Sequence, residues 1–329
     1  MKRLRQPAFK KKCLKFSSGI QLNLQVKRIK RPISGVLLLD KPSGLSSNQA
    51  LQQVKRLYQA AKAGHTGSLD PLATGLLPIC LGEATKFSHF LLDADKSYRA
   101  LIKLGSTTST GDAEGEVLSA AKVHVTPEAL NAALKQFIGV IQQVPPMYSA
   151  LKHQGKALYE YARAGVDIER AARTVTIHHI SLNAFEQDTL DITVGCSKGT
   201  YIRTLAEDVG EALGCGAHLA GLRRLSTAHF ELADTCTIEQ LEAMSLEARD
   251  ACLLAPDVVV QNLPAITLDA DSAYYLGRGQ QIWQAGVKFQ GLLRLYDLAG
   301  NFLGLGEAMD DGKIAPKRLI VNYHSEDFE

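Results

Sequence analysis

The apolar residues of this chain recur with two different periods, and the order of these periods constrains the fold. Residues 96–105 alternate between apolar and polar side chains, which predicts a strand. Residues 127–138 and 202–213 repeat their apolar side chains every three or four positions, which predicts helices. The predicted strands and helices are mixed without a regular strand–helix–strand repeat. This order favours an α+β fold over a doubly wound parallel sheet.

Shorter patterns predict further elements. Residues 35–44 resemble a buried strand that ends in a Pro-Ser-Gly turn, and either Ser46 or Ser47 is placed to cap the helix that follows. The other expected elements are strands at 76–82, 174–180 and 189–196, a short helix at 83–92, and a polar loop at 106–116.

The length of the chain and a change in its pattern of predicted elements indicate two domains. A chain of 329 residues that is 46% apolar can bury more than one core. Around residues 253–266 the pattern changes to a short helix followed by closely spaced strands, which predicts a small β-rich domain. We therefore expect an arm at 1–33, a large domain at 34–250, a small domain at 251–321 and a tail at 322–329.

The charge distribution is uneven along the chain. Residues 1–31 carry eleven of the 37 Lys and Arg residues and no acid, so the remaining chain is acidic overall. Such an arm can contact phosphates, but it is also typical of a solvated tail, a mis-assigned start or a transit peptide. Because the body is acidic, a polyanionic partner would have to bind where positive charge is gathered locally.

Several functional classes are not supported by the sequence. The apolar runs are too short to span a bilayer, and the start lacks the apolar segment of a signal peptide. The six cysteines are scattered without a C-x-x-C pair, as in reduced cytosolic proteins, and the nine histidines form no metal-binding spacing. We therefore expect a cytoplasmic protein with no membrane segment and no metal.

The stretch GHTGSLDPLATG, residues 64–75, contains a single carboxylate, that of Asp70. An aspartate before a proline in a glycine-rich loop is most often a turn residue or a helix cap. The alternative is an exposed acid that a rigid loop presents to a substrate, where it can attack a sugar anomeric carbon or act as a base beside it. In that role it needs a positive neighbour to stay ionised.

Other candidate residues lie far from this loop in the sequence. Arg203, beside the buried stripe of its predicted helix, could neutralise Asp70, or it could pair with Glu207 on the surface. Tyr98 is either a core aromatic or a residue that stacks on a flat ring. His65 and Asp112 are turn residues by default.

The densest mixture of basic and aromatic residues in the body lies between residues 144 and 173 and includes Lys152. Mixed Arg, Lys and Tyr side chains suit RNA loops, which are recognised by shape and stacking. Taken by themselves, the residues leave two classes open: an enzyme that uses one aspartate on nucleic acid, and a non-catalytic RNA-binding protein.

Five segments resemble one known family, in that family's order. GHTGSLDPLATGLLPICLGEATKF resembles the aspartate motif of the bacterial tRNA pseudouridine-55 synthases, the TruB family. The other four segments are GVLLLDKPSGLSSNQAL, KSYRALIKLGSTTSTGDAEG, VPPMYSALKHQGKALYEYARAG and CSKGTYIRTLAEDVGEALGCGAHLAGLRRL. The likeness extends from about residue 34 to 321, and its last part is similar to a small PUA-type RNA-binding domain. The basic arm is longer than the family pattern predicts.

The resemblance implies a pseudouridine synthase fold, with a mixed and largely antiparallel sheet flanked by helices, and a small β-rich C-terminal domain of PUA type. It implies that residues 34–250 form the catalytic domain, which isomerises uridine-55 in the tRNA T-loop without a cofactor. Asp70 matches the catalytic aspartate, Arg203 the arginine that pairs with it, and Tyr98 the tyrosine that stacks on the uracil.

The resemblance also implies residues that bind the substrate. His65 matches the histidine that takes the space of the flipped nucleotide, Leu222 an apolar residue of the base pocket, and Asp112 an acid of the active-site network. Lys152 and Tyr201 lie in matching segments and are expected to contact the RNA. The partner implied is the T-stem-loop of tRNA, bound by a monomer. An RNA chaperone with a vestigial motif and an isomerase of another RNA remain the competing hypotheses.

Overall fold

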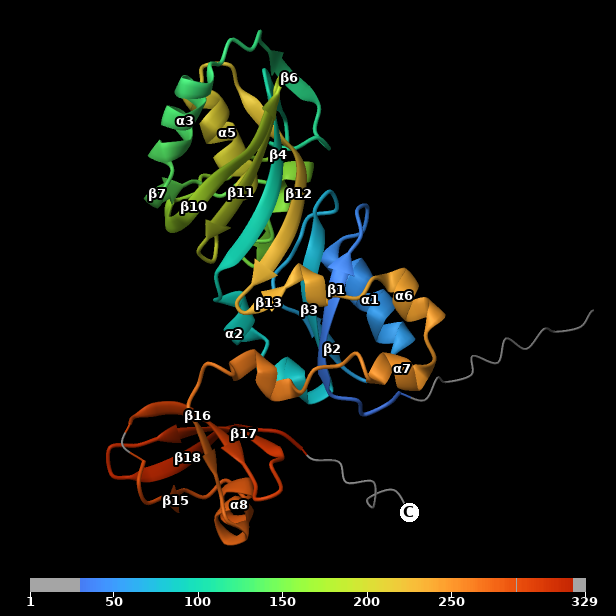
Figure 1. The fold of residues 1–329 in the computed structure, drawn as a ribbon, viewed down its shortest axis with the longest axis vertical. Helices are drawn as coiled ribbons and strands as arrows, with labels where there is room; N and C mark the ends of the chain where they lie inside the picture. The colour runs from blue at the N-terminus through green and yellow to red at the C-terminus, as the bar shows by residue number, and fades with distance from the viewer. Residues whose placement is uncertain (1–29, 288, 322–329) are drawn as a thin grey trace, which may run out of the picture.

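The structure, a computed structural model, describes residues 30–287 and 289–321 (Figure 1). Two separate sheets dominate it, one of nine strands and one of five. The predicted tail at 322–329 and nearly all of the predicted arm at 1–33 lie outside the described residues.

The nine-stranded sheet runs through the larger part of the molecule. Its neighbours in order are β1 (Gly35–Lys41), β3 (Thr74–Leu81), β12 (Ala217–Thr227), β4 (Lys96–Leu104), β11 (Thr189–Cys196), β10 (Arg173–Glu186) and β7 (Gly139–Gln143). At its margins, β2 (Ala63–His65) pairs with β3 and β13 (Phe230–Glu231) pairs with β12. Among the strand pairs of this sheet in the described part of the chain, only β3–β12 is parallel. The predicted α+β class, with a mixed and largely antiparallel sheet, is confirmed.

Three helices flank this sheet, each with a buried apolar stripe. The first, α1 (Ser47–Leu57), lies beside β1–β3, and Ser46 rather than Ser47 is its N-cap (Figure 1). On the other half of the sheet, α5 (Ile202–Ala212) contacts β12 and β4, and α3 (Pro127–Gln136) contacts α5. The smaller elements of this part are α2 (His89–Leu92), α4 (Leu158–Arg163), α6 (Ile238–Ala243), α7 (Leu246–Asp250), β5 (Ser106–Thr108), β6 (Val117–Ala120), β8 (Lys152–His153) and β9 (Lys156–Ala157).

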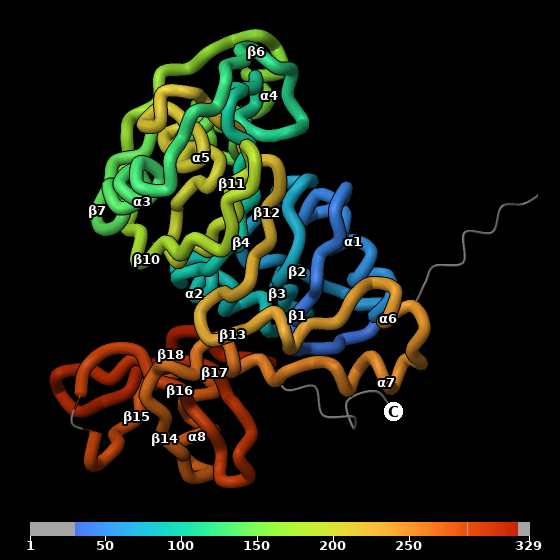
Figure 2. The backbone as a smooth tube through the Cα atoms, turned by 45° about the horizontal axis from the view of Figure 1, so that its top comes forward, coloured from blue at the N-terminus to red at the C-terminus, as the bar shows by residue number. Residues whose placement is uncertain are grey.

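Three expectations differ from the structure. The helix expected at 83–92 is a 3₁₀ turn, Gly82–Lys86, followed by the one-turn helix α2. The loop expected at 106–116 begins as strand β5, which pairs with β6. The sequence pattern did not predict β12, although this strand joins the two halves of the large sheet (Figure 2), because Arg223 and Arg224 interrupt its apolar alternation.

The five-stranded sheet comprises β14 (Ala265–Thr267), β16 (Gly291–Tyr296), β17 (Phe302–Ala308), β18 (Lys313–Leu319) and β15 (Ile282–Trp283), with α8 (Ala270–Gly277) beside it. It packs against the large sheet through a shared apolar cluster, in which the rings of Phe87 and Phe302 lie 5.5 Å apart. At the same contact, the Lys86 ammonium donates to the Leu319 carbonyl at 2.7 Å. The two sheets are therefore fixed to each other by both apolar and polar contacts.

Among the helices in residues 30–287 and 289–321, none is long and apolar enough to cross a membrane.

The parallel joint between β3 and β12 requires a glycine. Gly75 pairs with Arg224 across this joint and has a φ of +99°. A Cβ atom at Gly75 would lie 2.3 Å from the Arg224 carbonyl oxygen and 2.8 Å from its amide nitrogen. Both contacts are with backbone, so they cannot be relieved by a side-chain rotation.

We expect Gly75→Ala to lower the free energy of unfolding by about 3 kcal/mol, through left-handed backbone strain together with overpacking. Gly44→Ala is the matched control, since Gly44 has a φ of +82° but no atom within 4 Å of a Cβ. It should cost only the backbone strain, about 1–2 kcal/mol. Urea unfolding measures both, and equal losses in the two variants would contradict the close approach.

Candidate active site

A cleft of about 550 Å³ opens between the two halves of the large sheet. Its walls come from segments that are far apart in the sequence, around residues 46–48, 68–71, 110–114 and 148–150. Four predicted site residues line it: His65, Asp70, Asp112 and Arg203. Its volume lies in the range of sites that hold a small molecule or a single nucleotide.

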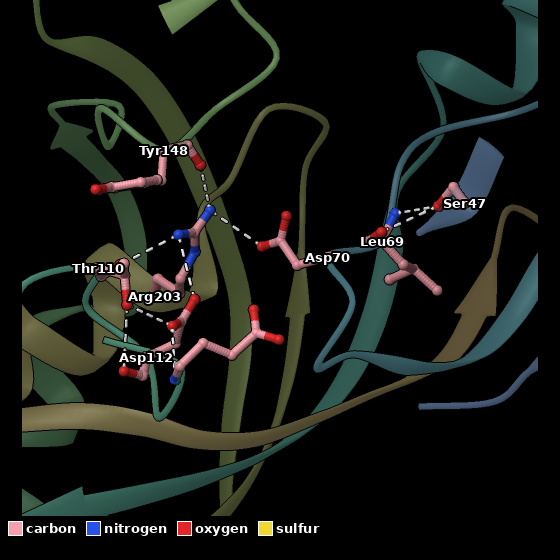
Figure 3. A network of polar contacts seen from close by, with 8 residues as sticks. Ser47, Leu69, Asp70, Thr110, Asp112, Tyr148 and Arg203 are labelled. Carbon is pink, nitrogen blue, oxygen red and sulfur yellow. Dashed lines mark hydrogen bonds and ion pairs between the residues drawn. The ribbon is translucent and has the colours of Figure 1, made fainter. Parts of the chain in front are cut away.

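The loop between β2 and β3 presents Asp70 to this cleft, where its side chain is about half exposed. The residue before it, Leu69, is held on both sides of its backbone by Ser47, whose hydroxyl donates to the Leu69 carbonyl at 3.0 Å and accepts from its amide at 2.7 Å (Figure 3). The Asp70 carbonyl in turn accepts from the Ala73 amide at 3.0 Å. The start of α1 therefore fixes the backbone that carries the acid.

Arg203 lies between two carboxylates, from the first turn of α5 (Figure 3). Its Nη2 is 3.0 Å from the Asp70 carboxylate, and its Nη1 is 3.3 Å from that of Asp112. The same guanidinium donates to the backbone carbonyls of Thr110 at 3.1 Å and Tyr148 at 2.6 Å. Its side chain is only 7% exposed, so these contacts replace water. The surface ion pair with Glu207 is not among the contacts of the described residues.

Asp112 is held by its own turn. Its carboxylate accepts from the Thr110 hydroxyl at 2.5 Å and from the Glu114 amide at 3.1 Å. Its side chain is 4% exposed. Because Asp112 cannot turn away, it holds one side of the Arg203 guanidinium, and the other side faces Asp70.

The charges around Asp70 oppose one another. Burial in the cleft raises the pKa of Asp70 above its usual range, and the nearby Asp112 carboxylate raises it further. The positive charges of Arg203 and Lys41 lower the same pKa. The protonation state of Asp70 therefore depends on these cations.

Sequence reasoning missed Lys41, the last residue of β1. It is fully buried, and its ammonium donates to the carbonyls of Pro42 at 2.9 Å and Leu45 at 2.6 Å. Burial lowers the pKa of Lys41 to about 8. A lysine inside the apolar run LLLDK was a usable signal, because a charged residue in a buried strand needs a partner. Ser47 was considered only as a helix cap, and nothing in its sequence context pointed to Leu69.

Tyr98 and Leu222 lie on neighbouring central strands and do not line the cleft directly. Tyr98, on β4, is 8% exposed and stands opposite Arg224 of β12. Burial raises the pKa of its phenol. Leu222, two residues before Arg224 and therefore on the same face of β12, is half-buried against the main core. Both residues thus form part of the floor behind the Asp70 loop.

The remaining predicted residues are placed differently. His65, at the end of β2, is half-buried in the cleft wall, and its Nδ1 is buried without a hydrogen-bond partner in the described part of the chain. Burial lowers the pKa of His65, which favours its neutral ring.

Tyr201 caps the start of α5, and its backbone amide and carbonyl exchange hydrogen bonds with the side-chain amide of Gln143. Lys152 is exposed on β8, outside the residues that line the cleft.

The arrangement has the elements of a single-carboxylate site. One acid faces a nucleotide-sized space, a buried guanidinium lowers its pKa against the effect of burial, and a buried phenol lies behind it. No cluster of three or more His, Cys, Asp or Glu side chains suited to a metal occurs between residues 30 and 321, leaving aside residue 288. A carboxylate in this setting can attack a sugar carbon or remove a proton beside it.

Three family models together match most of the chain. The model described as TruB family pseudouridylate synthase (N terminal domain) matches residues 55–202. Two further models, described as tRNA pseudouridylate synthase B C-terminal domain and as Pseudouridine synthase II TruB, C-terminal, match residues 203–263 and 264–320. The chain belongs to the TruB family of pseudouridylate synthases.

Relatives in this family are similar over nearly their whole length. A protein of Methylobacillus flagellatus named tRNA pseudouridine synthase B is 66% identical over 297 residues, which cover 90% of this chain and 98% of the relative. A protein of Pseudomonas paraeruginosa with the same name is 54% identical over 300 residues, with 90% and 99% covered. The family resemblance predicted from the sequence motifs is confirmed.

Solved structures support the same fold. A Cbf5–Nop10–Gar1 complex contains a chain that matches with a TM-score of 0.66 and 27% identity, covering 89% of this chain and 86% of that one. The archaeal box H/ACA Nop10–Cbf5 complex matches with a TM-score of 0.64 and 26% identity, covering 87% and 85%. The predicted TruB-type fold, with its β-rich C-terminal part, is confirmed.

We expect Arg203→Met to raise the pKa of Asp70 further, because the variant removes the nearest positive charge and leaves Lys41 to oppose the effects of burial and Asp112. Arg163→Met is the matched control, since Arg163 lines the same cleft but makes no ion pair with Asp70 in the described residues. Carbon-13 NMR of labelled aspartate, assigned with Asp70→Asn, measures this pKa. An unchanged or lower value in Arg203→Met would contradict the charge balance described above.

Proposed function

We propose that this chain isomerises a uridine of tRNA to pseudouridine, and that its target is uridine-55 in the T-loop. The observation that carries the proposal is the contact between Asp70 and Arg203, 3.0 Å apart in a nucleotide-sized cleft. The printed names of the relatives, tRNA pseudouridine synthase B, support tRNA as the substrate. The quoted motifs support the T-loop position.

The chemistry of the site suits a reaction that adds no water. Asp70 either attacks C1′ of the target ribose or removes the C2′ proton, and the N-glycosidic bond breaks in both routes. The released uracil turns and C5 joins C1′. In the first route the bond between Asp70 and C1′ breaks at this point, and in the second route Asp70 returns the proton to C2′. The C5 proton then leaves, and N1 takes up a proton. We assign to Tyr98 stacking on the uracil and acceptance of this proton. We assign to Arg203 the stabilisation of ionised Asp70, and none of these steps calls for a cofactor or metal.

The target base has to leave the folded T-loop before Asp70 can reach its ribose, at a cost of a few kcal/mol. A half-buried imidazole in the cleft wall supports our assignment of His65 to the space that the base vacates. Leu222 supplies an apolar wall for the base, and Asp112 and Tyr201 hold the surrounding network in this assignment.

RNA contacts beyond the target nucleotide are assigned to the segment 144–173, part of which lines the cleft. Basic groups lie over aromatic rings there: the Lys156 ammonium is 4.8 Å from the Tyr161 ring, and the Arg163 guanidinium is 5.4 Å from the Tyr159 ring. Such pairs present flat, positively charged surfaces that suit RNA loops. We assign the exposed Lys152 to the same surface, with the T-stem-loop as its ligand.

The proposal extends to the organisation of the chain. We assign residues 34–250 to the catalytic domain and residues 251–321 to a PUA-type RNA-binding domain. The enzyme is proposed to act as a monomer in the cytoplasm, where bacterial tRNA is modified. The separate five-stranded sheet, with its own apolar cluster, supports the division into two domains.

The test is to incubate the purified protein with an unmodified tRNA transcript and to map pseudouridine by carbodiimide treatment and primer extension. The wild-type protein should give one stop, at uridine-55, and Asp70→Asn should form pseudouridine roughly 10⁴-fold more slowly while still binding tRNA. Asp188→Asn, in a surface ion pair with Lys103, is the matched control and should react normally.

Three results would contradict the proposal or a part of it. A wild-type protein that binds tRNA but gives no stop would favour the RNA-binding class, and a stop at another uridine would move the substrate position. Near-normal turnover by Asp70→Asn would overturn the assignment of Asp70.

A further inference from the structure

Arg224 is the largest side chain that is completely buried among the described residues. It is a cation that cannot lose its proton at physiological pH. None of the carboxylates in residues 30–287 and 289–321 forms an ion pair with it, and its Nη1 is buried without a hydrogen-bond partner there. Burying an unpaired charge costs several kcal/mol, which the other contacts of Arg224 have to offset.

Arg224 contacts both ends of the loop that carries Asp70. Its Nε donates to the carbonyl of Leu76 at 2.6 Å, on the strand that follows the loop. Its Nη2 lies 3.5 Å from the carbonyl of Gly67, three residues before the acid. The main chain of Arg224 also pairs with Gly75 across the parallel joint. The side chain therefore closes the base of this loop.

On its other side, Arg224 faces Tyr98. The two residues are direct partners across β12 and β4, so their side chains share one face of the sheet. The Arg224 charge lowers the pKa of the Tyr98 phenol, against the effect of burial, which is larger. The other ionisable neighbours of Tyr98 are the Cys196 thiol and Asp70.

The remaining groups near Arg224 are basic and do not neutralise it. Its charge lowers the pKa of His65, and it contributes to the low pKa values of Lys41 and Lys96, each about 8. Of the groups it faces, the one that can become negative during the reaction and lies directly opposite is the Tyr98 hydroxyl.

We propose that Arg224 is a positioning residue for the isomerisation, which closes the base of the Asp70 loop and stabilises the phenolate of Tyr98 that accepts the C5 proton. This inference rests on the proposed function. In the step concerned, Tyr98 has already released its own proton to solvent. The C5–H bond of the rejoined uracil then breaks and the proton binds the phenolate oxygen. The C5–H electron pair forms the C5–C6 double bond, while the second C6–N1 pair moves to N1, which takes up a proton from solvent.

The test compares Arg224→Lys, which keeps the charge, with Arg224→Gln, which keeps a donor and removes the charge. Single-turnover rates are measured on tRNA transcripts that carry either hydrogen or deuterium at uridine C5, and tRNA affinity is measured separately. Arg223→Gln is the matched control, because Arg223 is next in the strand, pairs with Asp40 and binds Thr74 at the other face.

Arg224→Gln should react roughly 100-fold more slowly, the scale of a lost proton-transfer contribution. Its deuterium isotope effect should exceed that of the wild-type protein, because proton loss from C5 becomes slower than the preceding steps. Arg224→Lys should recover most of the rate and the wild-type isotope effect, and Arg223→Gln should behave as wild type. All variants should bind tRNA within about threefold of wild type, as expected for an effect on the chemical step.

Arg224→Lys and Arg224→Gln could lose the same rate with an unchanged isotope effect. Arg224 would then act only through packing, and the inference would be overturned. Wild-type rates in Arg224→Gln would also overturn it. If Arg224→Gln does not fold, as judged by its urea transition, Arg224→Lys alone decides, because a buried lysine loses its charge at high pH. An isotope effect that rises as this charge is lost supports the inference, and one that stays constant with pH overturns it. A wild-type protein that forms no pseudouridine would instead overturn the proposed function itself.

Discussion

The guanidinium of Arg203 has to neutralise two carboxylates in a place that water barely reaches. Asp112 holds it at 3.3 Å from one side and Asp70 at 3.0 Å from the other, and two backbone carbonyls accept further hydrogen bonds from its Nη1 and Nη2. A buried charge with this many partners has one stable orientation. The position of Asp70 in the cleft, and the ionisation that its proposed chemistry needs, both depend on that orientation.

The large sheet brings these groups together. Asp70 follows β2, Asp112 follows β5, and Arg203 begins α5, so the three residues come from separate parts of the chain. The parallel joint of β3 and β12 at Gly75 connects the half of the sheet that carries the Asp70 loop to the half that carries Tyr98. The C-terminal sheet is fixed to the first half through Phe87 and Phe302, so an RNA that contacts both sheets meets a rigid surface.

Much of the fold could be predicted from the sequence, where local patterns are strong. The alternation of β4 and the stripes of α3 and α5 give the observed elements within one or two residues. The strand β12 could not be predicted in this way, because its paired arginines resemble a solvated face. Their environment is set by β3 and β4, which are more than a hundred residues away.

The candidate site was accessible from the sequence only in part. The isolated acid of the 64–75 loop made Asp70 a candidate, and the motifs strengthened it, but 133 positions separate it from Arg203, and only the fold brings the two within 3.0 Å. Arg224 shows the limit more clearly, whereas Lys41 at least stands in an apolar run. The sequence does not distinguish a buried arginine or lysine from an exposed one, because burial is set by the tertiary structure.

The central claim is that ionised Asp70, held by a guanidinium shared with Asp112, is the reacting group. The most direct test is the pH dependence of single-turnover pseudouridine formation in the wild-type protein and in Asp112→Asn. The rate should fall on acidification as Asp70 takes up a proton. Since Asp112 raises the pKa of Asp70, its neutralisation should move this fall to lower pH. A fall at the same pH in both proteins, or a move to higher pH in Asp112→Asn, would contradict the account.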